Sequence, residues 1–324
     1  MIPFHTTIKL KHYKHITRAP FNAPDLGLAL GQVFPAQKVE LIDSGRSALA
    51  LAIEKLDLRG KKILMPAYVC NVLLPVLDAY EIQPVFLDID QKTFTPSNKS
   101  YTEDLLKEVD AVLLVATYGL VPEKSLIEKI KSLGKVVIED YAHVHFPKTE
   151  TRISSDARYY SLPKLMPVAD GGILVRNSQT SKESASSDPG PKFREPETLS
   201  LLTLKNWLKI FALPQFLISY FSILRNKKMT KIPAWRGIDK ANCSTERILY
   251  YYLTNEKVLW RAHDKYCQPV LVSNPHKAQV FNLVNGVISL RIWQDPIIFY
   301  ADQNPDNFPV TKEVSGHILC SPYF

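Results

Sequence analysis

The chain has 324 residues, of which 46% are hydrophobic and 22% charged, and its formal net charge is +8 with a pI of about 9.1. A chain of this length and composition is neither too short nor too polar to bury a hydrophobic core, and it is long enough for one large α/β domain plus a smaller one. A basic surface fits a phosphate-bearing ligand, a nucleic acid or an anionic membrane face, and it does not choose among them.

The cysteines and the apolar segments indicate a cytoplasmic protein. The four cysteines show no metal-ligand or redox spacing, and scattered thiols of this kind are typical of reduced proteins. The first 16 residues contain no apolar signal-peptide core. The most apolar window, 207–224, is interrupted by Lys209, Pro214 and Gln215, which predicts a buried or interface helix. Basic residues follow this window, so a membrane-surface contact is the less favoured alternative.

The pattern divides the chain into four parts. Residues 1–38 carry four prolines and are expected to form an irregular arm on the surface. In 39–176 short apolar runs alternate with segments of helical spacing, which predicts a largely parallel sheet covered by helices on both faces. The polar stretch 177–198 is expected to be a linker at a domain boundary. Residues 199–324 form the predicted smaller α+β domain.

Individual elements are predicted at these positions. The expected strands are 39–42, 63–65, 84–87, 111–116, 136–138, 158–161 and the run that Gly171 and Gly172 open; the expected helices are 48–56, 71–80, 102–107, 122–132, 199–224 and 245–265. In 278–293 the pair Asn285-Gly286 divides two apolar runs and predicts a β-hairpin.

The stretch 136–175 carries the strongest chemical signal. Asp140 follows one predicted strand and Lys164 lies just beyond the next. This is the arrangement that pyridoxal phosphate (PLP) needs, because a lysine forms a Schiff base with the cofactor and an acid keeps the pyridinium nitrogen protonated. His143 lies three residues after Asp140 and is placed to bind the ring hydroxyl. The alternative readings are a solvated lysine in a loop and an acid that caps a helix.

Two further motifs lie at the ends of predicted strands. Ser44-Gly45-Arg46-Ser47 separates a strand from a helix, so its backbone N–H groups suit a phosphate, although Ser44 alone is equally a helix cap. Arg46 is able to add a charge-assisted bond to an anion. Asp88 and Asp90 form a D-x-D motif, which a metal-dependent glycosyltransferase would use. His143 and His145 have no third ligand in view, so no metal site is predicted.

In the order of the chain, six of these motifs resemble the DegT/DnrJ/EryC1/StrS family of sugar aminotransferases. They are DSGRSALALAI, ILMPAYV, PVFLDIDQKTF, ATYG, VIEDYAH and YYSLPKLMPVADGGILV, and the late segment FPVTKEVSGHILCSP is similar to the family's C-terminal motif. The resemblance covers residues 39–176 well and 177–300 hardly at all. It implies the fold type I architecture of PLP enzymes, with a three-layer α/β/α large domain.

The resemblance also assigns roles by position. Lys164 would be the lysine that bonds the cofactor and moves the proton, and Asp140 would bind the pyridinium nitrogen. His143 would stand near the ring hydroxyl. The phosphate would be held by Ser161, Gly45 and Arg46. The ring-stacking aromatic of the family falls at Cys70, with Tyr68 two residues before it. Family members are homodimers, which we therefore expect here.

The departures from the family pattern keep a second hypothesis open. Lys164 lies only three positions after Ser161, where a spacing of five is commonest in the family, and the sequence ends soon after the late motif. The favoured hypothesis is a PLP-dependent transfer of an amino group, with glutamate as the expected donor, to a nucleotide-linked keto-sugar for polysaccharide or glycoconjugate synthesis. The alternatives are a catalytically altered binding or scaffold protein and, remotely, the glycosyltransferase. No nucleic-acid partner is expected.

Overall fold

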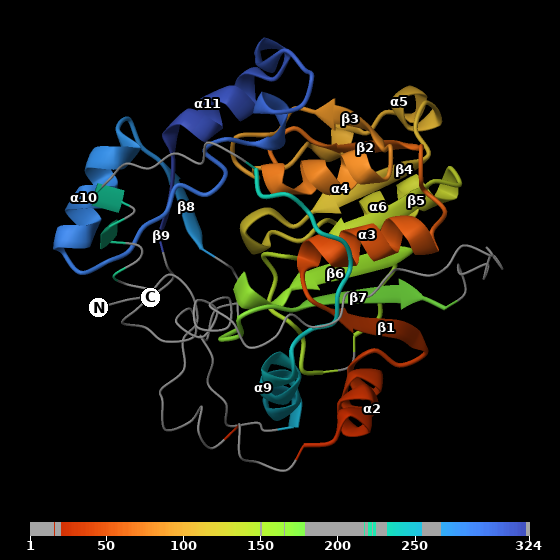
Figure 1. Cartoon of the computed structure of the whole chain (residues 1–324). Coiled ribbons are helices and arrows are strands. Elements are labelled where there is room, and N and C mark those ends of the chain that lie inside the picture. The colour runs from red at the N-terminus through yellow and green to blue at the C-terminus, as the bar shows by residue number, and fades with distance from the viewer. Residues whose placement is uncertain are drawn as a thin grey trace.

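The computed structural model describes residues 16, 21–149, 151–164, 166–178, 217, 220, 221, 223, 224, 232–254 and 267–321. A central sheet crosses the molecule (Figure 1), and its strands lie in the order β1-β7-β6-β5-β4-β2-β3. The strands are β1 (Gln37–Ile42), β2 (Lys62–Pro66), β3 (Gln83–Leu87), β4 (Ala111–Val115), β5 (Val136–Asp140), β6 (Ala157–Ser161) and β7 (Gly172–Asn177).

This sheet is mixed but mostly parallel, as predicted. β2 is parallel to β3 and β4, β4 to β5, and β5 to β6. β7 is antiparallel to both β6 and β1, so β1 runs in the same direction as β6. The carboxyl ends of β1, β2, β4, β5 and β6 therefore meet at one edge, which is where ligands bind in sheets of this type.

Helices cover both faces of the sheet and complete the predicted three layers (Figure 1). α3 (Gly45–Lys55) and α4 (Leu74–Ala79) cover one face, and α5 (Glu103–Lys107), α6 (Lys124–Ser132), α2 (Ala23–Val33) and α9 (Cys243–Thr254) cover the other. The alternation of side chains along each strand builds both cores, because Ile63 and Met65 face α3 while Leu64 packs with α6. The three-layer α/β/α architecture is thus confirmed.

The C-terminal part has a small sheet of its own. β8 (Gln268–Leu271) pairs antiparallel with β9 (Ile318–Ser321), and α10 (Pro275–Val284) and α11 (Pro309–His317) accompany them. Short 3-10 helices occupy Asn71–Leu73, Asn98–Ser100, Thr117–Gly119, Leu162–Lys164, Ile297–Phe299 and Pro305–Asn307. Within the described residues, no helix has the length and apolar character to cross a membrane.

Two predictions about local structure were wrong. The expected hairpin in 278–293 is replaced by α10, which begins after the cap Asn274 and ends at Val284, so Asn285-Gly286 terminates a helix. The arm expected to be irregular contains α2, which has Pro24 in its first turn, where a missing N–H costs nothing. The expected linker lies almost wholly outside the described residues, and most of the helix expected in 199–224 does too.

Candidate active site

The carboxyl edge of the sheet gathers the polar residues that the sequence singled out. Ser44 follows β1, Tyr68 follows β2 and Tyr118 follows β4. Asp140 is the last residue of β5, and Ser161 is the last residue of β6. The strand directions make these five residues neighbours although they span more than a hundred positions of the chain.

Asp140, His143 and Lys164 lie together at this edge. β5 and β6 are adjacent and parallel, and Lys164 ends the short 3-10 helix that follows β6 directly. The Asp140 carboxyl is buried, and this burial raises its pKa, while the positive charge of Lys164 and the N–H of Ala142, which donates to Oδ1 at 2.8 Å, act in the opposite direction. No hydrogen bond or ion pair joins Lys164 to another described residue.

His143 is neutral and its tautomer is fixed. Its side chain is 2% exposed, and this burial, followed by the nearby charge of Lys164, lowers the pKa of the imidazole well below its ordinary value. The backbone N–H of Tyr118 donates to Nδ1 at 3.2 Å. Since Nδ1 accepts this bond, the single proton of the neutral ring is on Nε2, which is able to donate to an oxygen.

Tyr159 places a buried hydroxyl next to Asp140. The two residues are partners in the register of β5 and β6, so their side chains share one face of the sheet. The Tyr159 side chain is 1% exposed, and its hydroxyl is a buried donor close to the Asp140 carboxyl. Burial raises the pKa of this tyrosine, and the negative charge of Asp140 raises it further. A buried donor beside a carboxylate is a feature of ligand sites.

The turn after β1 forms a close-fitting cradle against the ends of β6 and β7. Ser44 caps α3, because its Oγ accepts the N–H of Ser47 at 3.2 Å. A Cβ on Gly45 would lie 3.1 Å from the Cβ of Ser161, and a Cβ on Gly172 would lie 2.1 Å from the carbonyl oxygen of Ser44. Only glycine at position 172 therefore allows the two backbones to approach so closely, while a side chain at position 45 would be a tight fit against Ser161.

Replacing Gly172 by alanine is expected to push the Ser44 turn away from β7. The new methyl group has backbone atoms in its path, so we expect a loss of about 1–3 kcal/mol in the free energy of unfolding, as in overpacked cores. Urea denaturation measures this. The matched control is Gly27→Ala on α2, where nothing lies within 4 Å of the added Cβ, and where alanine should stabilise the helix by up to about 1 kcal/mol. Equal stability of the two variants would contradict the cradle.

The segment 233–239 runs along the same turn (Figure 1, cyan, crossing α3). Arg46 donates to the carbonyl of Pro233 at 3.2 Å, and the Ser47 hydroxyl donates to the carbonyl of Gly237 at 3.3 Å. Asp43 and Asp239 exchange backbone and side-chain bonds. The guanidinium predicted to hold an anion is thus engaged with the backbone in this structure, while Ser44, Gly45 and Ser161 are brought together as predicted.

The segment 292–297 carries an aromatic residue that the sequence reasoning missed. The indole ring of Trp293 stacks on His143 with ring centroids 4.8 Å apart and packs edge-on against Tyr68 at 5.4 Å. The segment is held by a bond from the hydroxyl of Tyr68 to the carbonyl of Ile292 and by the backbone pairing of Cys70 with Pro296. Trp293 lies in the predicted hairpin, so no signal in the sequence connected it with Asp140.

Comparison with known proteins assigns the family. A model of the DegT/DnrJ/EryC1/StrS aminotransferase family matches residues 30–190. The chain belongs to this family. The matched range contains α3, all seven strands of the large sheet and the residues around Asp140 and Lys164, so the resemblance of the motifs is confirmed.

Individual relatives of this family are distant. Protein MosB of Rhizobium meliloti is 27% identical over 146 residues, which are 42% of this chain and 28% of MosB. The dTDP-4-amino-4,6-dideoxy-D-glucose transaminase of Shigella dysenteriae is 29% identical over 154 residues, which are 45% of this chain and 41% of that enzyme. These matches span less than half of the curated relatives. An aminotransferase structure from Psychrobacter cryohalolentis matches with a TM-score of 0.64 at 12% identity, covering 98% of this chain and 93% of that one, and shows the fold.

In this member of the DegT/DnrJ/EryC1/StrS family the D-x-D motif has a structural role. The carboxylate of Asp88 accepts the N–H groups of Val310 and Thr311, at 3.0 and 2.9 Å, at the start of α11. Asp90 accepts the N–H groups of Lys92 and Thr93 in its own turn, which lowers its pKa. Asp88 therefore connects the end of β3 to the C-terminal part, and family membership removes the glycosyltransferase alternative.

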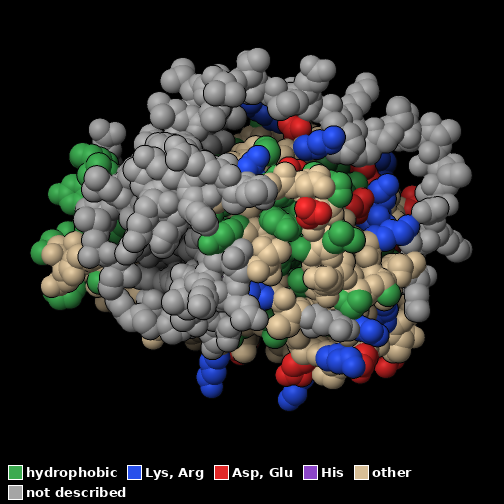
Figure 2. Space-filling model, turned by 90° about the horizontal axis from the view of Figure 1, so that it is seen from below, with side chains coloured by type: hydrophobic (Ala, Val, Ile, Leu, Met, Phe, Trp, Pro, Cys, Tyr) green, Lys and Arg blue, Asp and Glu red, His purple; other side chains and the backbone are tan. Residues whose placement is uncertain are grey.

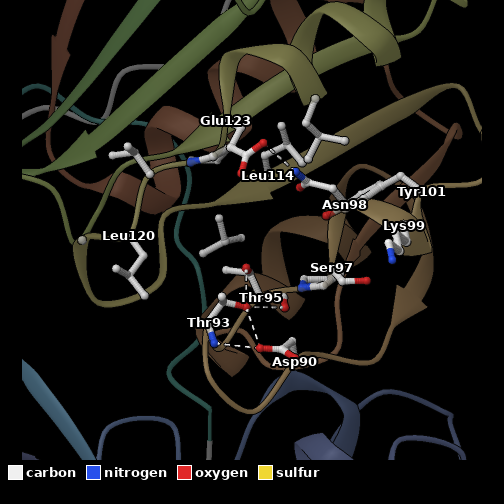
Figure 3. A pocket seen from close by; sticks show the side chains of 16 residues that line it. Asp90, Thr93, Thr95, Ser97, Asn98, Lys99, Tyr101, Leu114, Leu120 and Glu123 are labelled. Carbon is white, nitrogen blue, oxygen red and sulfur yellow. Dashed lines mark hydrogen bonds between the residues drawn. The ribbon is translucent and has the colours of Figure 1, made fainter.

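A cavity of about 860 Å³ opens beyond the carboxyl ends of β3 and β4 (Figure 3). Its polar side chains bond to one another, since Thr93 binds Asp90 and the amide of Asn98 donates to Glu123 at 2.8 Å. Phe94, between two lining residues, packs against Tyr118 with ring centroids 5.3 Å apart. Asp140, His143 and Lys164 are not among the residues that line this cavity.

Proposed function

We propose that this chain binds PLP and transfers an amino group from an amino acid to a keto-sugar on a nucleotide carrier. The observation that carries the proposal is the position of Lys164. Its positive charge acts on the pKa of both Asp140 and His143. Lys164 follows β6, and the other two lie at the end of the adjacent parallel strand β5 and just after it. A lysine bonds this cofactor and an acid partners its ring nitrogen, and the neutral imidazole of His143 beside them is able to donate to the ring oxygen.

The residues present fit the cofactor at both of its ends. The carboxylate of Asp140, with the hydroxyl of Tyr159 beside it, suits a protonated ring nitrogen and its surroundings. The Nε2–H of His143 suits the ring oxygen. The turn at Ser44 and Gly45, with Ser161 opposite, offers N–H groups and hydroxyls at the N-terminus of α3, which suits a phosphate.

Each residue has a defined task in the proposed reaction. When bound, PLP supplies an electron sink for the bond that breaks at the substrate carbon. Lys164 would bond the cofactor and, once the substrate amine has replaced it, its free amine would accept and return the proton of the substrate carbon. Asp140 keeps a proton on the ring nitrogen, and His143 donates to the ring oxygen. Tyr68 and Cys70 lie in the loop after β2, next to these residues. The ring of Tyr68 packs against Trp293, and Cys70 pairs with Pro296.

The substrate class rests on the relatives. The Shigella dysenteriae relative is a transaminase of a dTDP-linked amino sugar, so we propose a nucleotide-linked keto-sugar as the acceptor here. Glutamate is the proposed donor and a homodimer the proposed assembly. We also propose that the protein works in the cytoplasm, where nucleotide sugars and free amino acids are both present.

A catalytically altered binding protein is the second candidate. Trp293 stacks on His143, and Tyr118 stacks on both rings with centroids 5.8 and 5.9 Å away, so three aromatic rings crowd one side of the site. In a protein that has changed its chemistry, such packing would admit a cofactor or sugar without allowing turnover. The two candidates differ in what happens after an amino donor is added.

The deciding experiment is a spectral titration of the purified protein. PLP should produce a visible absorption band, and glutamate added without an acceptor should remove it as the amino group passes to the cofactor. Asp140→Asn should weaken PLP binding about ten- to a hundredfold, the effect of losing a charge-assisted hydrogen bond. Asp170→Asn, at a half-buried acid bonded to Thr245, is the matched control. A band that glutamate and other amino acids leave unchanged would favour the altered protein.

A further inference from the structure

Trp293 lies at the junction between the large sheet and the C-terminal part. Its half-buried indole packs against the core that contains α3 and α4 and also against the core that contains α10 and α11. The backbone is bound on both sides of this residue to the chain after β2. The hydroxyl of Tyr68 donates to the carbonyl of Ile292 at 3.1 Å. The amide of Asn71 donates to the carbonyl of Asp295 at 3.0 Å.

The backbone of Trp293 adopts a conformation that a bulky residue rarely takes. Its φ of +57° lies in the left-handed region, which costs free energy and persists only where the surroundings fix it, most often at functional sites. In this conformation the indole lies flat on the imidazole of His143, with ring centroids 4.8 Å apart and planes 23° apart. The strained residue of this segment is therefore the one that touches the candidate active site.

The same segment reaches His143 a second time, through Tyr118. The hydroxyl of Tyr118 donates to the carbonyl of Ile292 at 3.4 Å, and its backbone N–H donates to Nδ1 of His143 at 3.2 Å. The rings of Tyr118 and Trp293 lie 5.8 and 4.8 Å from the imidazole but only 5.9 Å from each other, so both are on one side of it. One face of the imidazole and its Nδ1 are thus both held by residues that the segment 292–297 contacts.

We propose that Trp293 is a positioning residue for His143, which holds the imidazole in one orientation and keeps water from it. This inference rests on the proposed function, in which the Nε2–H of His143 donates to the ring oxygen of the cofactor. A hydrogen bond weakens steeply when the donor turns away from its acceptor, so an imidazole that rotates freely would lose part of this bond. The alternative is an indole that only joins the two cores, which would stabilise the fold and leave the properties of His143 unchanged.

Histidine NMR of the protein without PLP tests the proposal, with His143→Gln to identify the signal. In the unmodified protein the pKa of His143 should lie well below its ordinary value, with the proton on Nε2. Trp293→Leu keeps an apolar side chain but removes the flat ring, so water reaches the imidazole and its pKa should rise toward the ordinary value of about 6.5. Trp293→Phe, which restores a flat ring, should keep the pKa low. Lys164, whose charge also lowers this pKa, is unchanged in both variants.

Phe281→Ala is the matched control, because it removes an aromatic ring from the same part of the chain at an exposed site. The Phe281 side chain is 69% exposed on α10. α10 lies at the left edge of Figure 1, away from the large sheet, and Figure 2 shows hydrophobic side chains exposed along the same edge. This variant should leave the pKa of His143 unchanged. The comparison uses the titration midpoint and the tautomer, because the loss of an indole shifts NMR signals by itself, and circular dichroism checks that each variant is folded.

PLP binding gives a second readout. Trp293→Leu should weaken it about two- to tenfold, the effect of a misplaced hydrogen bond. The double variant Trp293→Leu, His143→Ala should bind PLP as His143→Ala alone does, because Trp293 acts through His143. The proposal is overturned if His143 titrates in Trp293→Leu as in the unmodified protein, if Phe281→Ala changes the titration as much, or if the two effects on PLP binding add. Failure of the unmodified protein to bind PLP would instead refute the proposed function, and the NMR titration would still decide whether Trp293 holds His143.

Discussion

Replacing Lys164 by alanine is expected to abolish the visible absorption band that PLP produces with the unmodified protein. An alanine has no amine to bond the cofactor, and among the described lysines it is the charge of Lys164 that acts on Asp140 and His143. We expect transamination to become undetectable, because in the proposed reaction the same amine would bond the cofactor and move the proton. Absorption spectra at increasing PLP concentrations measure the first effect, and amino-acid turnover measures the second.

The variant should fold normally, which circular dichroism can check. Lys164 is half-buried in a 3-10 helix and has no hydrogen bond to another described residue, so its removal costs little packing. Lys124→Ala, at an exposed side chain on α6, is the matched control and should keep the full band. Reduction with borohydride followed by peptide mass analysis should place the cofactor on Lys164. A cofactor fixed to a different lysine would refute the assignment.

The large sheet and the position of the site were predictable because both depend on local patterns. Apolar runs such as 111–115 are buried on both faces, and segments of helical spacing separate these runs. The rule that parallel strands present their carboxyl ends to a ligand then places Asp140 and Ser161 at one edge. Their side-chain directions follow from the period of two along β5 and β6.

The C-terminal part was less predictable because one signal serves two structures. A glycine with positive φ ends a helix as well as it forms a hairpin turn. Gly286 has φ +78°, its N–H bonds the carbonyl of Leu283, and the N–H of Val287 bonds the carbonyl of Asn282. This is the hydrogen-bond pattern of a helix end. The cap at Asn274 and the Pro275 that follows it were the signals that distinguish the two structures.

Trp293 could not have been placed from the sequence. Its contact with His143 joins residues 150 positions apart and depends on how the segment 292–297 pairs with the loop after β2. Its φ of +57° is rare for a bulky residue, and Tyr118, with φ +55°, shares this feature and stacks on it. Such contacts are fixed by tertiary packing, which overrides local preference.

Glu139→Gln is expected to destabilise the fold strongly while leaving cofactor binding intact. Glu139 precedes Asp140, so its side chain points to the opposite face of the sheet. There its Oε2 accepts bonds from Nε and Nη2 of Arg158 at 3.1 and 2.9 Å, and the Glu139 side chain is fully buried. A neutral amide would leave the guanidinium buried without its counter-charge, which costs about 3–5 kcal/mol. Urea denaturation measures the loss.

The neighbouring acid supplies the matched control. Asp140→Asn removes a buried carboxyl whose burial already raises its pKa, so the free energy of unfolding should change little while PLP binding weakens. A second variant, Glu139→Gln with Arg158→Met, should recover much of the lost stability, because no unpaired charge then remains inside. If Glu139→Gln unfolded at the same urea concentration as the unmodified protein, the ion pair would not be stabilising the sheet. If Glu139→Gln weakened PLP binding as much as Asp140→Asn, the two acids would not be divided between the two faces as the register of β5 requires.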